Sequence, residues 1–342
     1  MNLNFSIIIA VYQREEELTE LLQSLDQQTD SSFEVIVVDD GSPNLLEPIV
    51  EEFKSKLTIQ YFYKENSGPA KSRNYGMKWA SGNYFIFLDS DTIAPATYIE
   101  TVRKELTENY VDAFGGPDAA DENFTDLQKA ITFSMTSFLT TGGIRGGKKH
   151  VGKFQPRSFN MGISKEAFEK TGGFGNLRIG EDPDLSMTLW KNGLETRLFP
   201  EAKVFHKRRT SLKKFAKQVY QFGVARPILN QRHPKFTKLT FWFPGLFIIG
   251  LILSFSAYPI PIHGWVRYIL RIPFPLYLIY FVLILIISTI QFKSIKVGFL
   301  SVITTLIQFS CYGFGFLKSW ILLNIFRKKA EKVFPGHFLS SK

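Results

Sequence analysis

Two short apolar runs in the first third of the chain end abruptly in acidic residues. The first, Val35–Val38, leads into Asp39-Asp40, and the second, Tyr84–Leu88, leads into Asp89-Ser90-Asp91. Runs that are apolar at every position are typical of strands buried on both faces of a parallel sheet covered by helices. Such sheets bind ligands just beyond the carboxyl ends of their strands. The two acidic strand ends therefore predict one site that handles a metal ion and a phosphorylated ligand.

Strand and helix patterns alternate over the first 110 positions. The patterns predict strands at 5–11, 35–38, 59–63 and 84–88, and helices at 14–27, 45–56 and 69–80. This βαβ rhythm predicts an α/β, Rossmann-like fold with a mostly parallel, doubly wound sheet. The chain contains no GxGxxG and no GxxxxGK[ST] sequence, so neither a dinucleotide fingerprint nor a P-loop is indicated.

Charge divides the chain into two unlike parts. Residues 1–201 carry 20 Lys and Arg against 30 Asp and Glu, whereas residues 202–342 carry 21 against a single acid, Glu331. A nucleic-acid-binding protein needs basic residues spread over its folded domain, and here the predicted folded domain is acidic. The split instead favours an acidic catalytic domain followed by a basic segment that faces a membrane.

Three apolar runs follow that basic segment, at Phe241–Tyr258, Phe274–Ile290 and Val297–Phe326. Their length and succession favour membrane helices over buried core helices. Eleven Lys and Arg residues lie between positions 203 and 238, where the positive-inside rule expects them if the N-terminal domain is cytosolic. Three full crossings would place Arg327-Lys328-Lys329 outside, against that rule. Either the last run is re-entrant or interfacial, or the basic tail is an exception.

These patterns predict two domains. A catalytic domain is expected over residues 1–225, with a basic interfacial segment at about 203–238. A membrane domain is expected over residues 239–342, with two or three transmembrane helices at about 240–258, 274–291 and 297–318 and a basic tail. The apolar stretch at 6–10 is too short for a signal peptide and already has a strand pattern.

The Asp89-Ser90-Asp91 sequence is a candidate metal site. Two carboxylates separated by one residue can bind a hard divalent cation such as Mn²⁺ or Mg²⁺, which in turn neutralises a diphosphate. A D-x-D sequence alone is weak evidence, because turns use aspartate freely. The apolar strand before it and the second acidic pair at Asp39-Asp40 strengthen the prediction.

Two further sequences have one structural and one chemical interpretation each. Asp182 precedes Pro183 at the start of a helix predicted to end near Gly193, so it is either a helix cap, a rigidly held general base, or both. His206 is followed by three cations, Lys207-Arg208-Arg209. It is either a structural histidine beside cations that attract the membrane surface, or a metal ligand beside arginines that bind a diphosphate.

Six segments, in this order, resemble family 2 glycosyltransferases. They are IIIAVY at 7–12, VDDGS at 38–42, NSGPAKSRN at 66–74, LDSD at 88–91, GGF at 172–174 and GEDPDL at 180–185. Their order and spacing agree over about residues 5–225, which makes the set specific although each piece is not. The resemblance implies a catalytic domain of the GT-A fold that uses a nucleotide-sugar donor.

The resemblance also implies roles for single residues. It places Tyr12 and Asp39-Asp40 at the nucleotide base and ribose, with Asp40 suited to accept from a uracil N3–H, and Arg73 at the nucleotide. Asp89 and Asp91 match the D-x-D pair, whose second member binds the metal, and Asp182 matches the general base. His206 resembles a histidine that completes the metal site, and Arg209 lies where the diphosphate is often held. Ala10 and Gly68 belong to the matching donor-site segments.

Two departures from the family pattern bear on the product. Ala10 stands where the family often has proline, a change that a strand-end turn should tolerate. Processive members carry Q-x-x-R-W before their pore-forming helices, whereas residues 218–222 read QVYQF, without the arginine and the tryptophan. With only two or three spans, the chain is expected to transfer single sugars rather than to extrude a polymer.

We therefore expect an inverting, Mn²⁺- or Mg²⁺-dependent glycosyltransferase that moves one sugar from a nucleotide-sugar, with a UDP-sugar favoured, to a lipid or lipid-linked glycan. It would be a multi-pass protein of the inner, cytoplasmic membrane with a cytosolic catalytic domain, acting in cell-surface polysaccharide or glycolipid synthesis. Its partners would be membrane lipids and these substrates, with no nucleic acid. A polyprenyl-phosphate glycosyltransferase and a short-chain polysaccharide synthase are alternatives within the class. A non-catalytic membrane scaffold is the alternative outside it.

Overall fold

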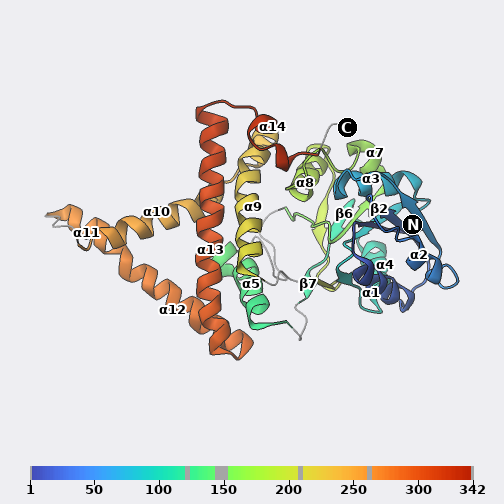
Figure 1. Cartoon of the computed structure of the whole chain (residues 1–342), viewed down its shortest axis with the longest axis horizontal. Helices are drawn as coiled ribbons and strands as arrows, with labels where there is room; N and C mark the ends of the chain where they lie inside the picture. Colours follow the sequence, from blue (N-terminus) through green and yellow to red (C-terminus); the bar gives the residue numbers. More distant parts are fainter. Residues whose placement is uncertain (1, 120–123, 143–152, 207–210, 260–263, 340–342) are drawn as a thin grey trace. The chain divides into compact units, whose positions relative to one another are not determined.

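The computed structural model describes the chain except for residues 1, 120–123, 143–152, 207–210, 260–263 and 340–342 (Figure 1). The chain forms two compact units. The first comprises residues 1–121, 148–207 and 334–342, and the second comprises residues 122–147 and 208–333. These limits differ from the domains predicted at 1–225 and 239–342, because contacts between residues far apart in sequence decide the division.

The first unit is built on a seven-stranded sheet. Its strands are β1 (Phe5–Val11), β2 (Phe33–Asp39), β3 (Ile59–Tyr63), β4 (Tyr84–Leu88), β6 (Ala113–Gly115), β8 (Asn160–Ser164) and β9 (Thr196–Leu198). They lie in the order β3-β2-β1-β4-β8-β6-β9. Strand β8 runs antiparallel to both neighbours, and every other neighbouring pair is parallel. The prediction of an α/β, mostly parallel sheet is confirmed.

Helices cover this sheet. They are α1 (Glu15–Asp26), α2 (Glu47–Phe53), α3 (Pro69–Trp79), α4 (Tyr98–Glu108), α7 (Lys165–Thr171) and α8 (Glu181–Lys191). Three predicted strands, at 5–11, 59–63 and 84–88, match the observed bounds. The helix predicted at 45–56 is shorter in the structure. Its first residues belong to a loop instead, because the amide of Leu46 donates to the side chain of Asp39 at 3.4 Å.

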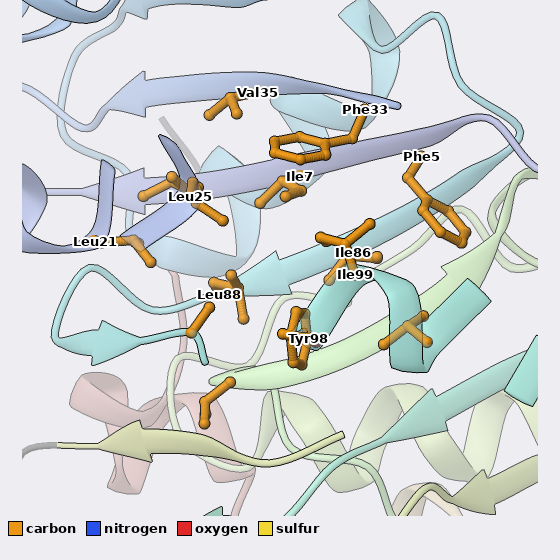
Figure 2. Close-up of a cluster of buried hydrophobic side chains, with 14 of the residues drawn as sticks. Phe5, Ile7, Leu21, Leu25, Phe33, Val35, Ile86, Leu88, Tyr98 and Ile99 are labelled. Atoms are coloured by element: carbon orange, nitrogen blue, oxygen red, sulfur yellow. The ribbon is translucent and has the colours of Figure 1, made fainter. Parts of the chain in front are cut away.

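Strands β1, β2 and β4 are buried on both faces. On one face, side chains of the central strands pack with those of α1 and α4, as Figure 2 shows for Ile7, Ile86, Leu21 and Tyr98. On the other face a second cluster packs with α3 and α8 and includes, from the strands, Ile8, Ile36, Val38, Phe85 and Phe87. Two buried faces explain why these strands are apolar at nearly every position.

A short chain segment at 334–339 also belongs to the first unit. It contains the 3₁₀ turn η4 (Pro335–His337), and it docks on the loop before α8. The amide of Arg178 donates to the carbonyl of His337 at 2.8 Å, and the amide of Leu339 donates to the carbonyl of Asn176 at 2.9 Å. The side chain of Leu339 packs against the second core cluster. We name residues 334–339 the docked tail.

All regular secondary structure among the described residues of the second unit is helical. Its α-helices are α5 (Asp126–Thr136), α6 (Phe138–Thr141), α9 (Leu212–Arg232), α10 (Phe243–Ser256), α11 (Trp265–Arg271), α12 (Pro273–Phe292), α13 (Ile295–Trp320) and α14 (Ala330–Val333). The 3₁₀ turns η1 (Pro234–Phe236) and η2 (Leu239–Trp242) precede α10, and a π-helical turn, η3 (Ile321–Ile325), extends α13. Helices α10 and α12 converge on α11 (Figure 1).

Within the described residues, three segments are long and apolar enough to cross a membrane. They are Leu239–Ser256, Tyr268–Phe292 and Ile295–Ile325, which agree with the three predicted runs. The segments differ in burial: in an 18-residue window of each, 39% of the third is buried inside the protein, against 11% and 6% of the other two. The third segment therefore packs on protein much more than the first two do.

Candidate active site

The candidate site lies at the carboxyl ends of the parallel strands. Strands β1, β2, β3 and β4 run in the same direction, so the residues that follow them gather at one edge of the sheet. That edge receives Tyr12 from β1, Asp39 and Asp40 from β2, and Asp89 from β4. This is the edge at which open α/β sheets bind ligands.

The carboxylate of Asp39 holds the loop that follows β2. It is fully buried and accepts from the amide of Ser42 at 2.9 Å and from the hydroxyl of Tyr61 at 2.8 Å. Burial, reinforced by the hydrogen bond to Asp39, raises the pKa of Tyr61 well above its usual range. Asp39 thus has its hydrogen bonds within the protein, and its predicted contact with a nucleotide stays a prediction.

Asp40 holds the loop that leads into α3. Its carboxylate accepts from the amides of Ser67 at 2.9 Å and Gly68 at 2.8 Å, and from the ammonium of Lys64 at 2.5 Å. Gly68 precedes the first residue of α3 with φ +92°, a conformation that favours glycine. Asp40 is 4% exposed, so it too is bonded inside the fold. Its predicted contact with a uracil N3–H stays a prediction.

The two aspartates after β4 are bonded differently. The carboxylate of Asp89 accepts from the guanidinium of Arg73 at 2.6 Å, and Asp91 forms an ion pair with Arg14. These side chains are 32% and 16% exposed. Their turn is closed by Thr92, whose hydroxyl donates to the carbonyl of Asp89 at 2.7 Å. Both carboxylates of the D-x-D sequence thus face arginines.

Arg73 is the centre of the site. Its side chain is 5% exposed and lies over the ring of Phe174, 5.3 Å from the ring centroid. One guanidinium nitrogen, Nη2, donates to Asp89, but the other, Nη1, is buried and has no hydrogen-bond partner among the described residues. A buried N–H group without a partner costs free energy, about 1–3 kcal/mol. Such a group is poised to donate to a ligand.

Glu181 and Asp182 lie close enough to Arg73 to interact electrostatically with it. Helix α8 begins at Glu181 after Gly180, which has φ +89°. The prediction that the helix starts at Pro183 with Asp182 as its cap was therefore wrong, because the glycine turn comes earlier. The oxygen Oδ1 of Asp182 is buried and has no hydrogen-bond partner in the part of the chain that the structure describes.

Burial changes the acidity of both carboxyl groups. Burial, with the neighbouring charge of Asp182, raises the pKa of Glu181 to about 8. Burial also raises the pKa of Asp182, although Arg73 and Arg157 oppose this shift. A carboxylate whose pKa is raised toward neutrality is a better proton acceptor than an ordinary aspartate. The pair is therefore equipped for proton transfer.

Arg14 is a site residue that the sequence analysis missed. It lies immediately after Gln13, whose φ of +52° turns the chain away from β1, and it reaches Asp91 across 77 positions of sequence. Arg14 also lines a cavity of about 370 Å³ beside the strand ends, together with Gln13, Glu15, Glu16, Glu17, Pro43 and Asn44. No local pattern distinguishes this arginine from other basic residues at the start of a helix.

The remaining predicted residues are placed as follows. Tyr12 is 43% exposed at the end of β1, and Ala10 is half-buried beside Val38 of β2. Strand β10 (Val204–His206) pairs with β5 (Thr92–Ile93), so the backbone of His206 lies opposite Thr92, next to the D-x-D turn. The side chain of His206 and the whole of Arg209 lie outside the described residues, and their predicted roles stay predictions.

The oxygen atoms of Asp89 and Asp91 fit a hard divalent cation such as Mn²⁺ or Mg²⁺, which prefers carboxylate ligands. In the described part of the chain, no group of three or more His, Cys, Asp and Glu side chains converges on one point. The two aspartates would therefore need further ligands from a phosphate, water or His206. Arg14 would also have to release Asp91.

Comparison with known proteins shows the family of the chain. The family described as "Glycosyl transferase family 2" matches residues 6–172. An uncharacterised glycosyltransferase of Haemophilus influenzae is 31% identical over 223 residues, which cover 60% of this chain and 70% of that protein. The minor teichoic acid biosynthesis protein GgaB of Bacillus subtilis is 30% identical over 215 residues, 61% of this chain and 23% of that protein. Most of the first-ranked curated relatives are far longer, and the chain matches only 15–23% of their length.

A solved structure supports the fold. The mannosyltransferase PcManGT of Pyrobaculum calidifontis, in complex with GDP-Man and Mn²⁺, superimposes with a TM-score of 0.51 at 17% identity, covering 70% of this chain and 66% of that one. The relatives, the matched family and the fold agree with the resemblance seen in the sequence. The chain is an enzyme of glycosyltransferase family 2, with a catalytic unit of the GT-A fold.

Proposed function

We propose that the protein transfers one sugar from a nucleotide-sugar, with a UDP-sugar favoured, to a hydroxyl group of a lipid or lipid-linked glycan at the cytoplasmic face of the membrane. One observation carries the proposal. The buried Arg73 nitrogen Nη1 and the buried Asp182 oxygen Oδ1 both lack partners among the described residues, and they belong to one electrostatic cluster. The Arg73 nitrogen can donate a hydrogen bond to an anionic phosphate, and the Asp182 oxygen can accept the proton of a hydroxyl group.

Asp182 is the proposed general base. It would accept the proton of the acceptor hydroxyl as the oxygen forms its bond to the anomeric carbon and the bond to the diphosphate breaks. A single displacement of this kind inverts the configuration at that carbon. Burial raises the pKa of Asp182, so the carboxylate binds the proton more strongly at the moment of attack.

Arg73, Asp89 and Asp91 form the proposed donor side of the site. Arg73 would bind the nucleotide with the nitrogen that is not engaged by Asp89. Asp91, with Asp89, would hold Mn²⁺ or Mg²⁺, and His206 is a further candidate ligand. When bound, such a cation supplies positive charge that stabilises the departing diphosphate. Arg14, freed from Asp91, would then lie within reach of the same phosphates.

The proposed acceptor is amphipathic. Helix α9 carries Lys213, Lys214 and Lys217 in its first two turns, and its buried side contains Phe215 and Val219. That apolar side packs on α5 and α13 within the protein, and the lysines suit the anionic head groups of a membrane surface. The GgaB relative is, by its name, a teichoic acid biosynthesis protein, which supports an acceptor in the synthesis of a surface polymer. A polyprenyl phosphate or a short growing polysaccharide is the alternative acceptor.

A donor panel tests the proposal. Thermal unfolding of the detergent-solubilised full chain is measured with UDP-, GDP-, CDP- and dTDP-sugars, each with and without Mn²⁺. A specific donor should stabilise the protein by about 2.7 kcal/mol at a hundredfold excess over its Kd. The donor selected is then offered with lipid-linked acceptors, and the product length separates single transfer from short-chain synthesis. Failure of every donor to bind, hydrolyse or transfer would favour a non-catalytic scaffold.

A further inference from the structure

The docked tail restricts how often the chain crosses the membrane. The chain leaves the first unit near residue 207, forms the whole second unit, and returns to the first unit at residue 334. Two hydrogen bonds of 2.8 and 2.9 Å, a β-bridge between Phe338 and Leu177, and the packing of Leu339 fix this return. A single folded unit cannot lie on both sides of a bilayer. The number of full crossings between residues 207 and 334 must therefore be even, although three segments are apolar enough to cross.

Helix α13 is the apolar segment that does not cross the membrane, because of the helices that pack against it. Gly223 of α9 is so close to α13 that an added Cβ would lie 2.2 Å from the carbonyl of Tyr312. Farther along the same two helices, the hydroxyl of Ser319 donates to the carbonyl of Val224 at 2.9 Å. A helix this tightly packed on α9 must share its depth in the membrane.

Helix α9 cannot span the hydrocarbon core. It carries Lys213, Lys214 and Lys217 in its first half and Arg226 and Arg232 in its second half. Lys217 and Arg226 are separated by nine positions, about 13.5 Å of helix at 1.5 Å per residue. The hydrocarbon core is about 30 Å thick, so at least one cation would be forced inside it. Helix α9 therefore lies at the interface, and α13 lies there with it.

A second neighbour of α13, helix α5, agrees with this position. Helix α5 packs along its first half, where the hydroxyl of Thr304 donates to the carbonyl of Ala130 at 3.1 Å. At the start of α13, Lys296 forms an ion pair of 3.0 Å with Asp126, the first residue of α5. The exposed side of α13 remains apolar, with Phe299 57% and Phe314 65% exposed. This is the arrangement of a helix that presents one face to lipid and the other to protein.

Helices α10 and α12 have the opposite character. Their segments of 18 and 25 residues are almost unburied. They meet at α11, where Trp265 and Tyr268 are 73% and 63% exposed and Arg271 donates to the carbonyl of Ala257 at 2.9 Å. Exposed tryptophan and tyrosine with arginine are typical of a membrane–water interface. The tip of this hairpin thus suits the far surface of the bilayer.

We propose that the protein crosses the bilayer twice, through the α10–α12 hairpin, while α13 lies along the cytoplasmic surface with α5 and α9. The occupant of the exposed apolar surface of the hairpin is the lipid bilayer itself. This topology resolves the conflict in the sequence, because Arg327, Lys328 and Lys329 then lie on the cytoplasmic side, as the positive-inside rule requires. The inference does not depend on which sugar is transferred.

Single-cysteine labelling tests the topology. Cys311 is the only cysteine of the chain, so Cys311→Ser provides a cysteine-free background. Trp265→Cys reports on the hairpin tip, Lys332→Cys on the segment before the docked tail, and Ser55→Cys on the first unit. Tyr268→Cys and Glu331→Cys replace the first two if those variants do not accumulate in the membrane. Each full-length variant is treated with a membrane-impermeant maleimide in intact bacterial cells and after lysis.

We expect Trp265→Cys to be labelled equally before and after lysis, and Lys332→Cys and Ser55→Cys to be labelled only after lysis. Labelling of Lys332→Cys in intact cells while Ser55→Cys stays protected would establish an odd number of crossings and overturn the proposal. Protection of both tip variants in intact cells would show a re-entrant hairpin, which also overturns it. Labelling of Ser55→Cys in intact cells would overturn the cytoplasmic placement of the first unit.

Discussion

The ends of β2 and β4 have nearly the same sequence pattern and different physical roles. Asp39 and Asp40 accept chiefly from backbone amides and are at most 4% exposed. Asp89 and Asp91 meet arginine side chains and remain 32% and 16% exposed. Backbone amides cannot move away without unfolding a loop, whereas the side chain of Arg14, 37% exposed, can rotate away from Asp91. The first pair therefore shapes the site, and Asp91 can exchange its arginine for a cation.

An acidic residue at a strand end can therefore have either of two roles. A carboxylate that follows a buried strand can orient the next loop or can bind a cation, and the sequence pattern is the same in both cases. Only the donors that surround it distinguish the two. Asp182, with one oxygen that lacks a described partner, is the extreme case of the second kind.

The largest effect is expected at Asp182. Asp182→Asn should lower turnover by about 10²–10⁴-fold, the usual cost of losing a general base, because an amide cannot accept the proton. Donor affinity, measured by thermal shift with the selected nucleotide-sugar, should stay close to that of the wild type. Glu166→Gln is the control and should leave turnover unchanged, because Glu166 is an exposed carboxylate of α7 outside the site. A collapse of donor affinity in Asp182→Asn would instead assign this residue to the donor site.

The activity is expected to require a metal ion that Asp91 binds. Asp91→Asn should lose most activity and should need more Mn²⁺ for half-maximal activity, because the amide is a poorer ligand. Its thermal stability without metal should change little, since its partner Arg14 is 37% exposed. EDTA should inactivate the wild type reversibly. Full turnover of wild type and variant in EDTA would end the metal hypothesis.

Substitution of Asp39, at the end of β2, should lower the stability of the protein, in contrast to substitution of Asp91. Asp39→Ala leaves the amide of Ser42 and the hydroxyl of Tyr61 without their acceptor, and each buried unsatisfied group costs about 1–3 kcal/mol. We expect a lower thermal midpoint for the detergent-solubilised protein, with Asp39→Asn in between. If Asp91→Asn lowered the midpoint as much as Asp39→Ala, the contrast between the two strand ends would be wrong.

Stability should depend on pH through Glu181. Burial and the charge of Asp182 raise its pKa to about 8, above the unfolded value of about 4.3. A raised carboxyl pKa means that the folded state favours the protonated form. This contribution is complete below about pH 4.3 and is lost as the pH rises to about 8. The thermal midpoint should therefore fall over this range in the wild type and fall less in Glu181→Gln. An equal fall in both would place the titrating group elsewhere.

The smallest effect is expected at Arg14. Arg14→Gln removes the cation that competes for Asp91, so Mn²⁺ should bind a few-fold more tightly in the absence of donor, by titration calorimetry. Arg103→Gln is a control, because Arg103 pairs with Asp30, another aspartate of the first unit. Weaker Mn²⁺ binding in Arg14→Gln would show that Arg14 orients Asp91 rather than competing for it.

The sequence predicted those parts of the fold that local pattern determines. Strands β1 and β4 have two buried faces and are apolar at nearly every position, so they were located to the residue, as was the edge strand β3. Strand β2, predicted at 35–38, extends over Phe33–Asp39. The start of α8 was misplaced because Gly180, and not Asp182, ends the preceding loop. Arg14 was missed because its partner lies 77 positions away. The docked tail was missed for the same reason, since its contacts at 176–178 lie about 160 positions earlier in the chain.

The docked tail also imposes an order on biosynthesis. An added Cβ at Gly68, where α3 begins, would lie 2.6 Å from the side chain of Leu339, so the tail completes the wall of the donor-side loop. Leu339 leaves the ribosome after α10, α12 and α13 have been made. The loop that carries Asn176 and leads to Asp182 thus gains this support only once the hairpin has been synthesised. In the order of synthesis, this side of the site is therefore completed after the hairpin.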